Sequence, residues 1–165
     1  MLLGTLTLDP PRVAHGADIQ RLIGECAPLD VNSTYAYLLL CEHHAATCVH
    51  AALDGRTVGF VSGYQVPART DVLFVWQVAV AAQMRGRGLA KTMLLDLLSR
   101  PHSKDCHHLE TTISPSNAPS RALFHSLAHT LCAPVTEKPL FLQQHFGKDS
   151  HEPEILVRIG PFASP

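Results

Sequence analysis

The chain has 165 residues, and its 13 Lys and Arg residues nearly balance its 14 Asp and Glu residues, for a formal net charge of −1 at pH 7. This length predicts a single domain, residues 1–165. A net charge this close to zero creates no overall electrostatic field that would attract a nucleic acid or an anionic membrane, so any anion-binding site must be local. The five cysteines form no CxxC pair, which disfavours disulfides or zinc and favours a reducing cytoplasm. No apolar run approaches the roughly 20 residues of a membrane span, and no signal sequence is recognisable.

The first third of the chain predicts two helices and a hairpin. Ile19, Leu22 and Cys26 have helical spacing in a segment from about residue 17 to 27. A second helix follows Ser33, a favoured N-cap residue. The runs TCVHAAL and TVGFVSGYQV then flank an Asp-Gly pair, which is typical of a tight turn between antiparallel strands.

The remaining elements alternate between strands and helices. VLFVWQVAV is apolar on both faces, as in a central strand, and LAKTMLLDLLSR is a helix that ends before Pro101. HHLETTIS predicts a strand, SNAPSRALFHSLAH a capped helix and PEILVRIG a final strand. The prolines, including Pro134 and Pro139, are expected in loops. The fold class is therefore mixed α/β with a central sheet.

The segment QMRGRGLAKTML, residues 83–94, joins the central strand to a helix. A helix that begins after a glycine turn directs unpaired N–H groups and a positive dipole end forward, which suits a phosphate. Gly86 and Gly88 allow close approach, and Arg85 and Arg87 can add charged hydrogen bonds. Neither GxxxxGK[ST] nor GxGxxG is present. This pattern alone is equally consistent with an ordinary helix N-terminus whose two arginines are solvated.

The pattern Gln83-x-x-Gly86-x-Gly88 after a buried strand resembles the acetyl-CoA loop of the GNAT superfamily of N-acetyltransferases, over about residues 58–128. The resemblance implies a mixed sheet of about six to seven strands with about four helices, and acetyl-CoA as co-substrate. It also implies pyrophosphate binding by loop amides, pantetheine binding by the preceding strand and a contact from the start of the next helix. The implied cofactor residues are Val78, Val80, Arg85, Gly86, Arg87, Gly88, Leu89, Ala90 and Asn117.

A closer resemblance extends from about residue 19 to 162. The phrases PLDVNSTYAYLLL, VGFVSGY, LFVWQVAV, HLETTISPSN and HEPEILVRIGPF occur in one order and resemble the diaminobutyrate acetyltransferase family of ectoine biosynthesis. This resemblance implies acetyl transfer from acetyl-CoA to the γ-amine of L-2,4-diaminobutyrate, by direct attack in a ternary complex. It also implies a homodimer.

Such an acceptor has two ammonium groups and one carboxylate, so its pocket should supply more acid than base and an aromatic surface. Each candidate also has an ordinary explanation: Asp30 as a helix cap, Trp76 as core, Glu110 as a solvated strand position, and the residues near 151–154 as a charged loop. Glu110 is the least ordinary, because a carboxylate on a central strand needs a partner or a function. The predicted acceptor residues are Asp30, Trp76, Glu110, His151, Glu152 and Glu154.

The chemistry requires further groups. An amine with a pKa near 10.4 is only about 1 part in 10³ neutral at pH 7, so a base is needed; Glu110 is the first candidate and His151 the second. The resemblance implies that the backbone N–H of Val78 stabilises the oxyanion. Many GNAT enzymes use a helix tyrosine as general acid where this chain has Phe124, which cannot serve. Tyr35, Tyr37, a water or no acid at all remain open.

The 11 histidines raise the question of a metal site, particularly at the pairs 43–44 and 107–108. Adjacent histidines point in different directions and no HxxxH pattern occurs, so no metal is expected. Two alternatives to the acceptor assignment remain. One is a GNAT enzyme that acts on another small amine or a protein amine, and the other is a non-catalytic acyl-CoA sensor.

Overall fold

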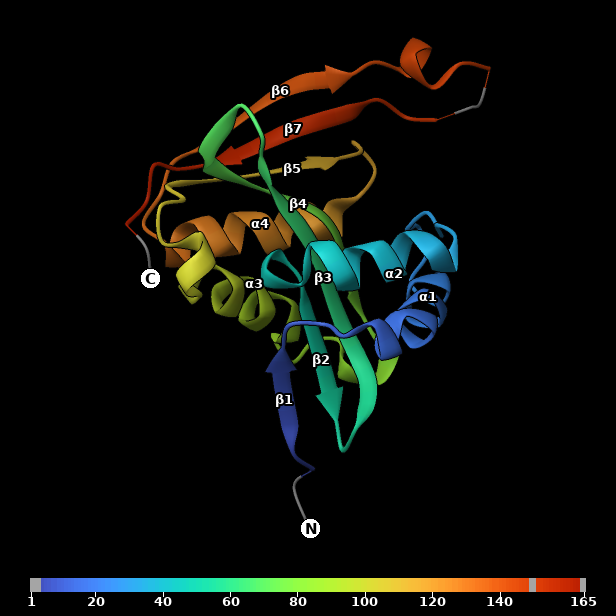
Figure 1. Ribbon diagram of the computed structural model, residues 1–165. Helices are drawn as coiled ribbons and strands as arrows, with labels where there is room; N and C mark the ends of the chain where they lie inside the picture. Colours follow the sequence, from blue (N-terminus) through green and yellow to red (C-terminus); the bar gives the residue numbers. More distant parts are fainter. Residues whose placement is uncertain (1–3, 149–150, 164–165) are drawn as a thin grey trace. The chain divides into compact units, whose positions relative to one another are not determined.

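The computed structural model describes residues 4–148 and 151–163. Its strands form a seven-stranded sheet in the order β1-β2-β3-β4-β5-β7-β6, and the β4–β5 pair is parallel (Figure 1). The α/β prediction of about six to seven strands and about four helices is therefore confirmed. The strands are β1 (Leu6–Asp9), β2 (Val49–Leu53), β3 (Arg56–Val66), β4 (Arg69–Val80), β5 (His108–Ile113), β6 (Val135–Phe141) and β7 (Glu154–Ile159); the α-helices are α1 (Gly16–Gly24), α2 (Thr34–His43), α3 (Leu89–Ser99) and α4 (Ala118–Thr130).

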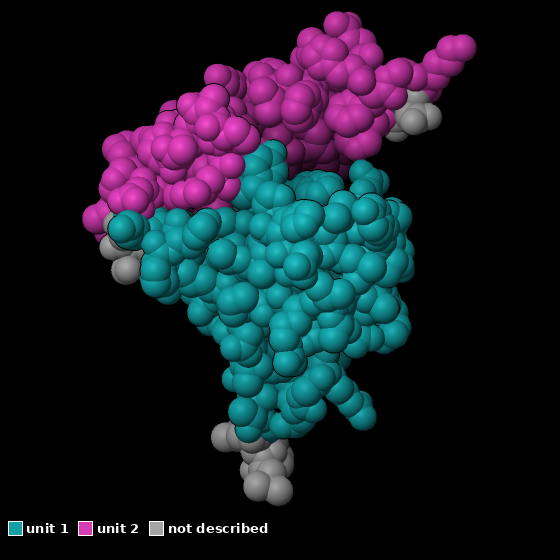
Figure 2. Space-filling view, viewed as in Figure 1, with its two compact units in different colours: residues 1–64, 75–104 teal, residues 65–74, 105–165 magenta. Residues whose placement is uncertain are grey.

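Two compact units divide the chain (Figure 2). Unit 1 comprises residues 1–64 and 75–104, and unit 2 comprises residues 65–74 and 105–165. Strand β4 passes through both, because its residues 69–74 belong to unit 2 and its residues 75–80 to unit 1. Unit 1 carries α1, α2, α3 and β1 to most of β3, and unit 2 carries α4, β5, β6 and β7.

In unit 1 the β2–β3 hairpin has helices on both faces. Its turn contains Asp54 and Gly55 at φ angles of 49° and 76°, which confirms the predicted Asp-Gly hairpin. Gly59 and Phe60 are neighbours in β3, so their Cα substituents point to opposite faces. The ring of Phe60 lies edge-on to Tyr37 of α2, whereas a Cβ at Gly59 would clash with Met93 of α3. Helices α2 and α3 therefore cover opposite faces of this pair.

The predicted helices are confirmed with small changes at their ends. Ser33 caps α2 by accepting the N–H of Ala36 at 3.2 Å, and the Asn117 side chain caps α4 by accepting the N–H of Ser120 at 3.2 Å. The first helix ends at Gly24, before the predicted residue 27. Pro28 disfavours helical geometry at the residue before it, which is consistent with this earlier end. Within the described residues, no helix is both long and apolar enough to cross a membrane.

The sequence interpretation was wrong about the two edges of the sheet. It missed β1, and it assigned Pro139 to a loop although Pro139 lies within β6. Both β1 and β6 are edge strands, where proline is tolerated because one side of the strand needs no ladder donor. The β6–β7 register also shifts between Pro139 and Phe141. Edge strands bury few side chains, so their hydrophobic pattern is weak.

Candidate active site

The glycine loop lies between the end of β4 and the start of α3. Gly86 and Gly88 have φ angles of 72° and 78°, and Gly88 is the N-cap of α3. The first bond of the helical ladder runs from Thr92 N to Gly88 O at 3.0 Å. The amides of Leu89 and Ala90 therefore precede this ladder, at the positive end of the helix dipole. No atom lies within 4 Å of a Cβ placed at either glycine, so the backbone there is open to a bound group.

The two loop arginines differ in their surroundings. Arg85 folds back onto β4, where its Nε donates to the carbonyl of Val80 at 3.1 Å and its Nη2 approaches the Sγ of Cys26 at 3.6 Å. The thiol of Cys26 donates to the same carbonyl at 3.4 Å. Arg87 is exposed and has no partner in the described part of the chain. Of the two side chains, Arg87 is therefore the better placed to approach an anion.

The last part of β4 presents two amides away from β3. The N–H of Gln77 donates to the hydroxyl of Ser62, and the N–H of Ala81 donates to the carbonyl of Val58. Both acceptors lie on β3. Because N–H groups alternate between the two edges of a strand, those of Val78 and Val80 point to the other edge. The Val80 carbonyl already accepts two protein donors, so the amide is the main-chain group that Val80 can offer.

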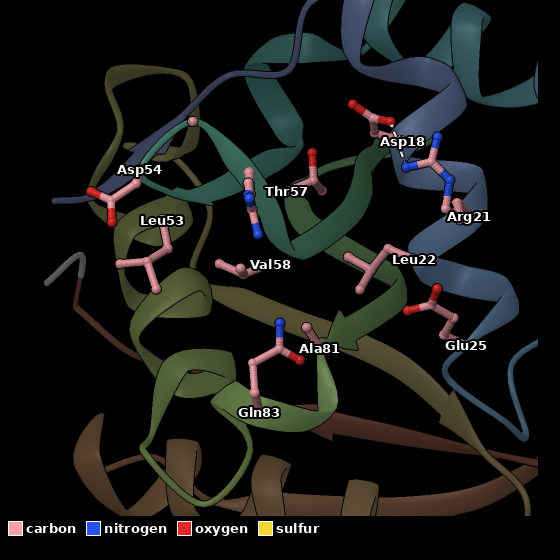
Figure 3. Close-up of a pocket in the computed structure, with 12 residues that line it drawn as sticks. Asp18, Arg21, Leu22, Glu25, Leu53, Asp54, Thr57, Val58, Ala81 and Gln83 are labelled. Atoms are coloured by element: carbon pink, nitrogen blue, oxygen red, sulfur yellow. Dashed lines mark ion pairs between the residues drawn. The ribbon is translucent and has the colours of Figure 1, made fainter. Parts of the chain in front are cut away.

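A cavity with a volume of about 780 Å³ lies in unit 1 beside α1, and Figure 3 shows side chains that line it. Its wall includes the Asp18–Arg21 ion pair, which joins Oδ1 to Nη1 at 2.9 Å. The wall also contains Gln83 but none of residues 85–90, and none of the predicted acceptor residues. The lining residues are Asp18, Arg21, Leu22, Glu25, Leu53, Asp54, Gly55, Arg56, Thr57, Val58, Ala81 and Gln83.

The acceptor candidates of unit 1 lie around Gln77. Its side-chain amide donates to the carbonyl of Asp30 at 2.8 Å, and the Tyr37 hydroxyl donates to its Oε1 at 3.2 Å. The side chain of Asp30 itself is exposed, and because Ser33 is the cap of α2, Asp30 is not that cap. Trp76 is 46% exposed, which contradicts its interpretation as core.

The two tyrosines proposed as general acids have opposite environments. Tyr37 is fully buried, and its hydroxyl also accepts the N–H of Asn32 at 3.2 Å. Tyr35 is 68% exposed and has no hydrogen-bond partner among the residues described. A hydroxyl that is free of protein partners can reach a leaving group more readily, so Tyr35 is the better candidate.

Glu110 is the charged centre of unit 2. It is 2% exposed, which excludes the solvated strand position, and both its oxygens accept from Arg69, at 2.7 and 2.9 Å. Arg158 on β7 donates to Oε1 at 2.5 Å. Burial would raise the pKa of Glu110, but the hydrogen bonds and charges of the two arginines outweigh it and lower that pKa. A carboxylate so stabilised is a weak base, which favours a binding role for Glu110 over proton abstraction.

The His151 to Glu154 segment leads into β7. The Nδ1 of His151 bonds to the carbonyl of Glu152, and the imidazole stacks on Phe146 with centroids 4.0 Å apart. A carbonyl only accepts, so Nδ1 carries the proton, and Nε2, which has no hydrogen-bond partner among residues 4–148 and 151–163, can accept one. Glu152 accepts a hydrogen bond from Ser116, while Glu154 is half-buried at the start of β7.

Histidine does not cluster with other metal-binding side chains in the described ranges, 4–148 and 151–163, where no group of three or more His, Cys, Asp or Glu could hold a metal. In the adjacent pair, His107 contacts the carbonyl of Phe162 and His108 contacts Asp71, each at 3.2 Å. The two rings thus have separate partners.

Several residues that organise these regions were missed from the sequence. Arg69 and Arg158 complete the Glu110 cluster, and Ser62 and Gln77 anchor the end of β4. Only Arg158 carried a signal, because it is a charged residue within the apolar strand pattern PEILVRIG. The partners of the others depend on pairing between strands, which one sequence does not display.

Comparison with known proteins identifies the family whose sequence pattern includes this glycine loop and the strand before it. Residues 17–128 match the acetyltransferase (GNAT) family. The match covers more than half of the chain and includes the glycine loop, so the chain belongs to this family of acetyltransferases.

More specific relatives share nearly the whole chain. It is 54% identical to the L-2,4-diaminobutyric acid acetyltransferase of Bordetella parapertussis, over 96% of this chain and 86% of that protein. It is 46% identical to the protein of the same name from Methylotuvimicrobium alcaliphilum, over 97% and 93% of the two chains. These relatives confirm the resemblance to the diaminobutyrate acetyltransferase family.

Solved structures agree. The diaminobutyrate acetyltransferase EctA from Paenibacillus lautus, in complex with its substrate L-2,4-diaminobutyric acid and coenzyme A, superposes with a TM-score of 0.94, with 37% identity over 98% of both chains. The ribosomal-protein-S18-alanine N-acetyltransferase of Escherichia coli has a TM-score of 0.71 at 14% identity, which shows a shared fold alone.

Proposed function

We propose that this chain transfers the acetyl group of acetyl-CoA to the γ-amine of L-2,4-diaminobutyrate, giving N4-acetyl-L-2,4-diaminobutyrate for ectoine synthesis. The observation that carries this proposal is the end-to-end similarity to the Paenibacillus lautus enzyme that was solved with diaminobutyric acid and coenzyme A. The family match runs from residue 17 to 128 and so spans parts of both units, which supports treating residues 1–165 as one GNAT-like domain.

The glycine loop is proposed to bind the pyrophosphate of acetyl-CoA. The amides of residues 85–90 precede or begin α3, and the open space at Gly86 and Gly88 allows close approach. Arg87 would add a charged hydrogen bond. The amides of Val78 and Val80 would bind the pantetheine arm, and Asn117, while capping α4, would contact the cofactor as well.

The chemical step is direct attack in a ternary complex. The amine nitrogen forms a bond to the thioester carbonyl carbon and loses a proton, while the carbon–sulfur bond breaks and the thiolate of coenzyme A takes up a proton. The N–H of Val78 is proposed to stabilise the oxyanion. His151 is the proposed base, because its Nε2 has no hydrogen-bond partner in the described part of the chain, and Tyr35 is the proposed acid.

The acceptor is proposed to contact Asp30, Trp76, Glu152 and Glu154. An exposed indole suits a short aliphatic chain with a terminal cation. The carboxylates would compensate the two ammonium groups. The direct test is a kinetic comparison of diaminobutyrate with its longer homologues, ornithine and lysine, with the acetylated nitrogen located by NMR.

A homodimer is also proposed. Strand β6 is a sheet edge that is exposed along nearly all its length, and Leu140, Phe141 and Leu142 are each at least 37% exposed. These three exposed apolar side chains at the end of β6 form a surface that a second copy of the chain would cover. Light scattering should report a dimer, and Phe141→Asp should shift it toward monomer; a monomeric unmodified protein would refute this.

A cytoplasmic location is proposed as well. All five cysteines are free, and four of them are buried, as expected in a reducing compartment. Cell fractionation followed by immunodetection tests this: recovery in an exported or membrane fraction would contradict it.

A further inference from the structure

Glu110, Arg69 and Arg158 form a charged cluster on three strands of unit 2. Glu110 lies on β5, opposite Phe74 of β4 and opposite Arg158 of β7 in the strand register. Arg69 extends from the start of β4. Two guanidinium groups around one carboxylate leave the cluster with a formal charge of +1. One more anion would make it neutral.

The two arginines use their donors differently. Arg69 commits both terminal nitrogens to the two oxygens of Glu110. Arg158 commits only Nη1, and its Nε and Nη2 have no partner among residues 4–148 and 151–163. These two nitrogens form one edge of the guanidinium, which is the arrangement that binds a carboxylate through two parallel hydrogen bonds. The Arg158 side chain is 30% exposed, so this edge is accessible to a small ligand.

We propose that Arg158 binds the α-carboxylate of the amino-acid acceptor and that Glu110 is the positioning residue that fixes its guanidinium plane. This inference rests on the proposed function, since diaminobutyrate carries such a carboxylate. It also supplies what the acidic candidates for the acceptor pocket lack, a cation for the single negative group of the substrate. Arg158 then determines specificity for amino acids over simple diamines.

The test compares two acceptors that differ only in this group. Loss of the carboxylate from diaminobutyrate gives 1,3-diaminopropane, which keeps both amines and the carbon chain between them. For Arg158→Gln, kcat/KM with diaminobutyrate should fall by about 10- to 150-fold, as expected for the loss of a hydrogen bond to a charged group. With 1,3-diaminopropane it should change by less than about 3-fold, since that acceptor makes no such bond.

Arg69→Gln is the matched control. It also removes one guanidinium from Glu110, but Arg69, unlike Arg158, has both terminal nitrogens already bonded to that carboxylate. Its effect should therefore be the same on both acceptors. A purely structural role for the cluster predicts that Arg158→Gln behaves likewise, and an equal loss on both acceptors would overturn the proposal.

Two further measurements keep the outcome clear. If Arg158→Gln does not fold, Arg158→Lys keeps the charge beside Glu110 without the paired edge, and the same difference between acceptors is required of it. If the unmodified protein acetylates other amines but not diaminobutyrate, the proposed function fails. If it acetylates diaminobutyrate and the variants affect both acceptors equally, only the role of Arg158 fails.

Discussion

The N–H of Gln77 donates to the hydroxyl oxygen of Ser62 at 3.1 Å, so a side chain of β3 fixes the backbone of β4 one residue before Val78. Both residues are buried. The side chain of Gln77 also binds the carbonyl of Asp30 and the hydroxyl of Tyr37. The β4 backbone is thus anchored to β3, to α2 and to the loop before α2, at the point where the Val78 amide is proposed to meet the oxyanion.

Ser62→Ala should weaken this anchor. Leaving the buried N–H of Gln77 without its acceptor is expected to lower the free energy of unfolding by about 1–3 kcal/mol. If the anchor positions Val78, kcat should fall more than the KM for acetyl-CoA rises. Urea unfolding and steady-state kinetics measure the two effects. Ser99→Ala, at an exposed hydroxyl that bonds to Asp96 in α3, is the control and should change neither.

Gly86→Asp tests the pyrophosphate seat. It places a carboxylate where a phosphate is proposed, so the KM for acetyl-CoA should rise by about 10-fold or more. Gly86→Ala is the matched control, because it imposes the same strain at a φ of 72° without charge, and no atom would contact its Cβ. Equal KM values for the two variants would show that the loop does not bind phosphate.

Glu110→Gln and His151→Gln distinguish a positioning residue from a base. The two arginines lower the pKa of Glu110 against the opposing effect of burial, so its loss should raise the KM for diaminobutyrate and leave the acidic limb of the kcat–pH profile in place. His151→Gln should lower kcat, because it removes the proposed base. If the limb disappears in Glu110→Gln, Glu110 is the base after all.

His50 should make folding stability depend on pH. Burial, then the charges of His15 and Arg12, lower its pKa from 6.5 to about 4, against the raising effect of the carboxylates of Asp9 and Asp18. Between pH 6.5 and about 4, the unfolded chain therefore binds a proton that the folded chain does not bind. The free energy of unfolding should be constant above about pH 6.5 on this account and fall by roughly 3 kcal/mol as the pH drops to about 4.

Urea unfolding of His50→Gln between these pH values checks the assignment. The ring of His50 stacks on His15 with centroids 3.9 Å apart, and its Nε2 bonds to Thr57 at 2.8 Å, so the variant should be less stable near neutral pH but less sensitive to acid. His43→Gln, on the exposed end of α2, should retain the full dependence. An unchanged slope in His50→Gln would refute the role of this histidine.

The sequence predicted those parts of the fold whose signal is local. The Asp54-Gly55 turn, the Ser33 cap and the Gly88 helix start follow from the chemistry of a few adjacent residues, and all three are observed. Strand β6 was missed because Pro139 interrupts it and an edge strand buries little of its surface. The family resemblance extended over most of the chain, because it rests on several sequence segments that occur in the same order.

Less of the candidate site than of the fold could be predicted from the sequence. Glu110 was recognised as an unusual carboxylate, but its partners Arg69 and Arg158 lie 41 and 48 positions away in the sequence. Which residue faces which depends on strand register, and a shift of one position would turn every side chain to the other face. Which charged residues come together in such a cluster can therefore be determined only when the strand pairing is known.

Steady-state kinetics with acetyl-CoA and three acceptors, L-2,4-diaminobutyrate, ornithine and lysine, tests the central claim most directly. The acceptors differ by one methylene at each step, and each methylene should alter kcat/KM by about 10- to 200-fold in a pocket shaped for the shortest. We expect diaminobutyrate to be preferred by at least this factor and its γ-nitrogen to carry the acetyl group in the product. Equal kcat/KM values for the three acceptors would contradict the assignment.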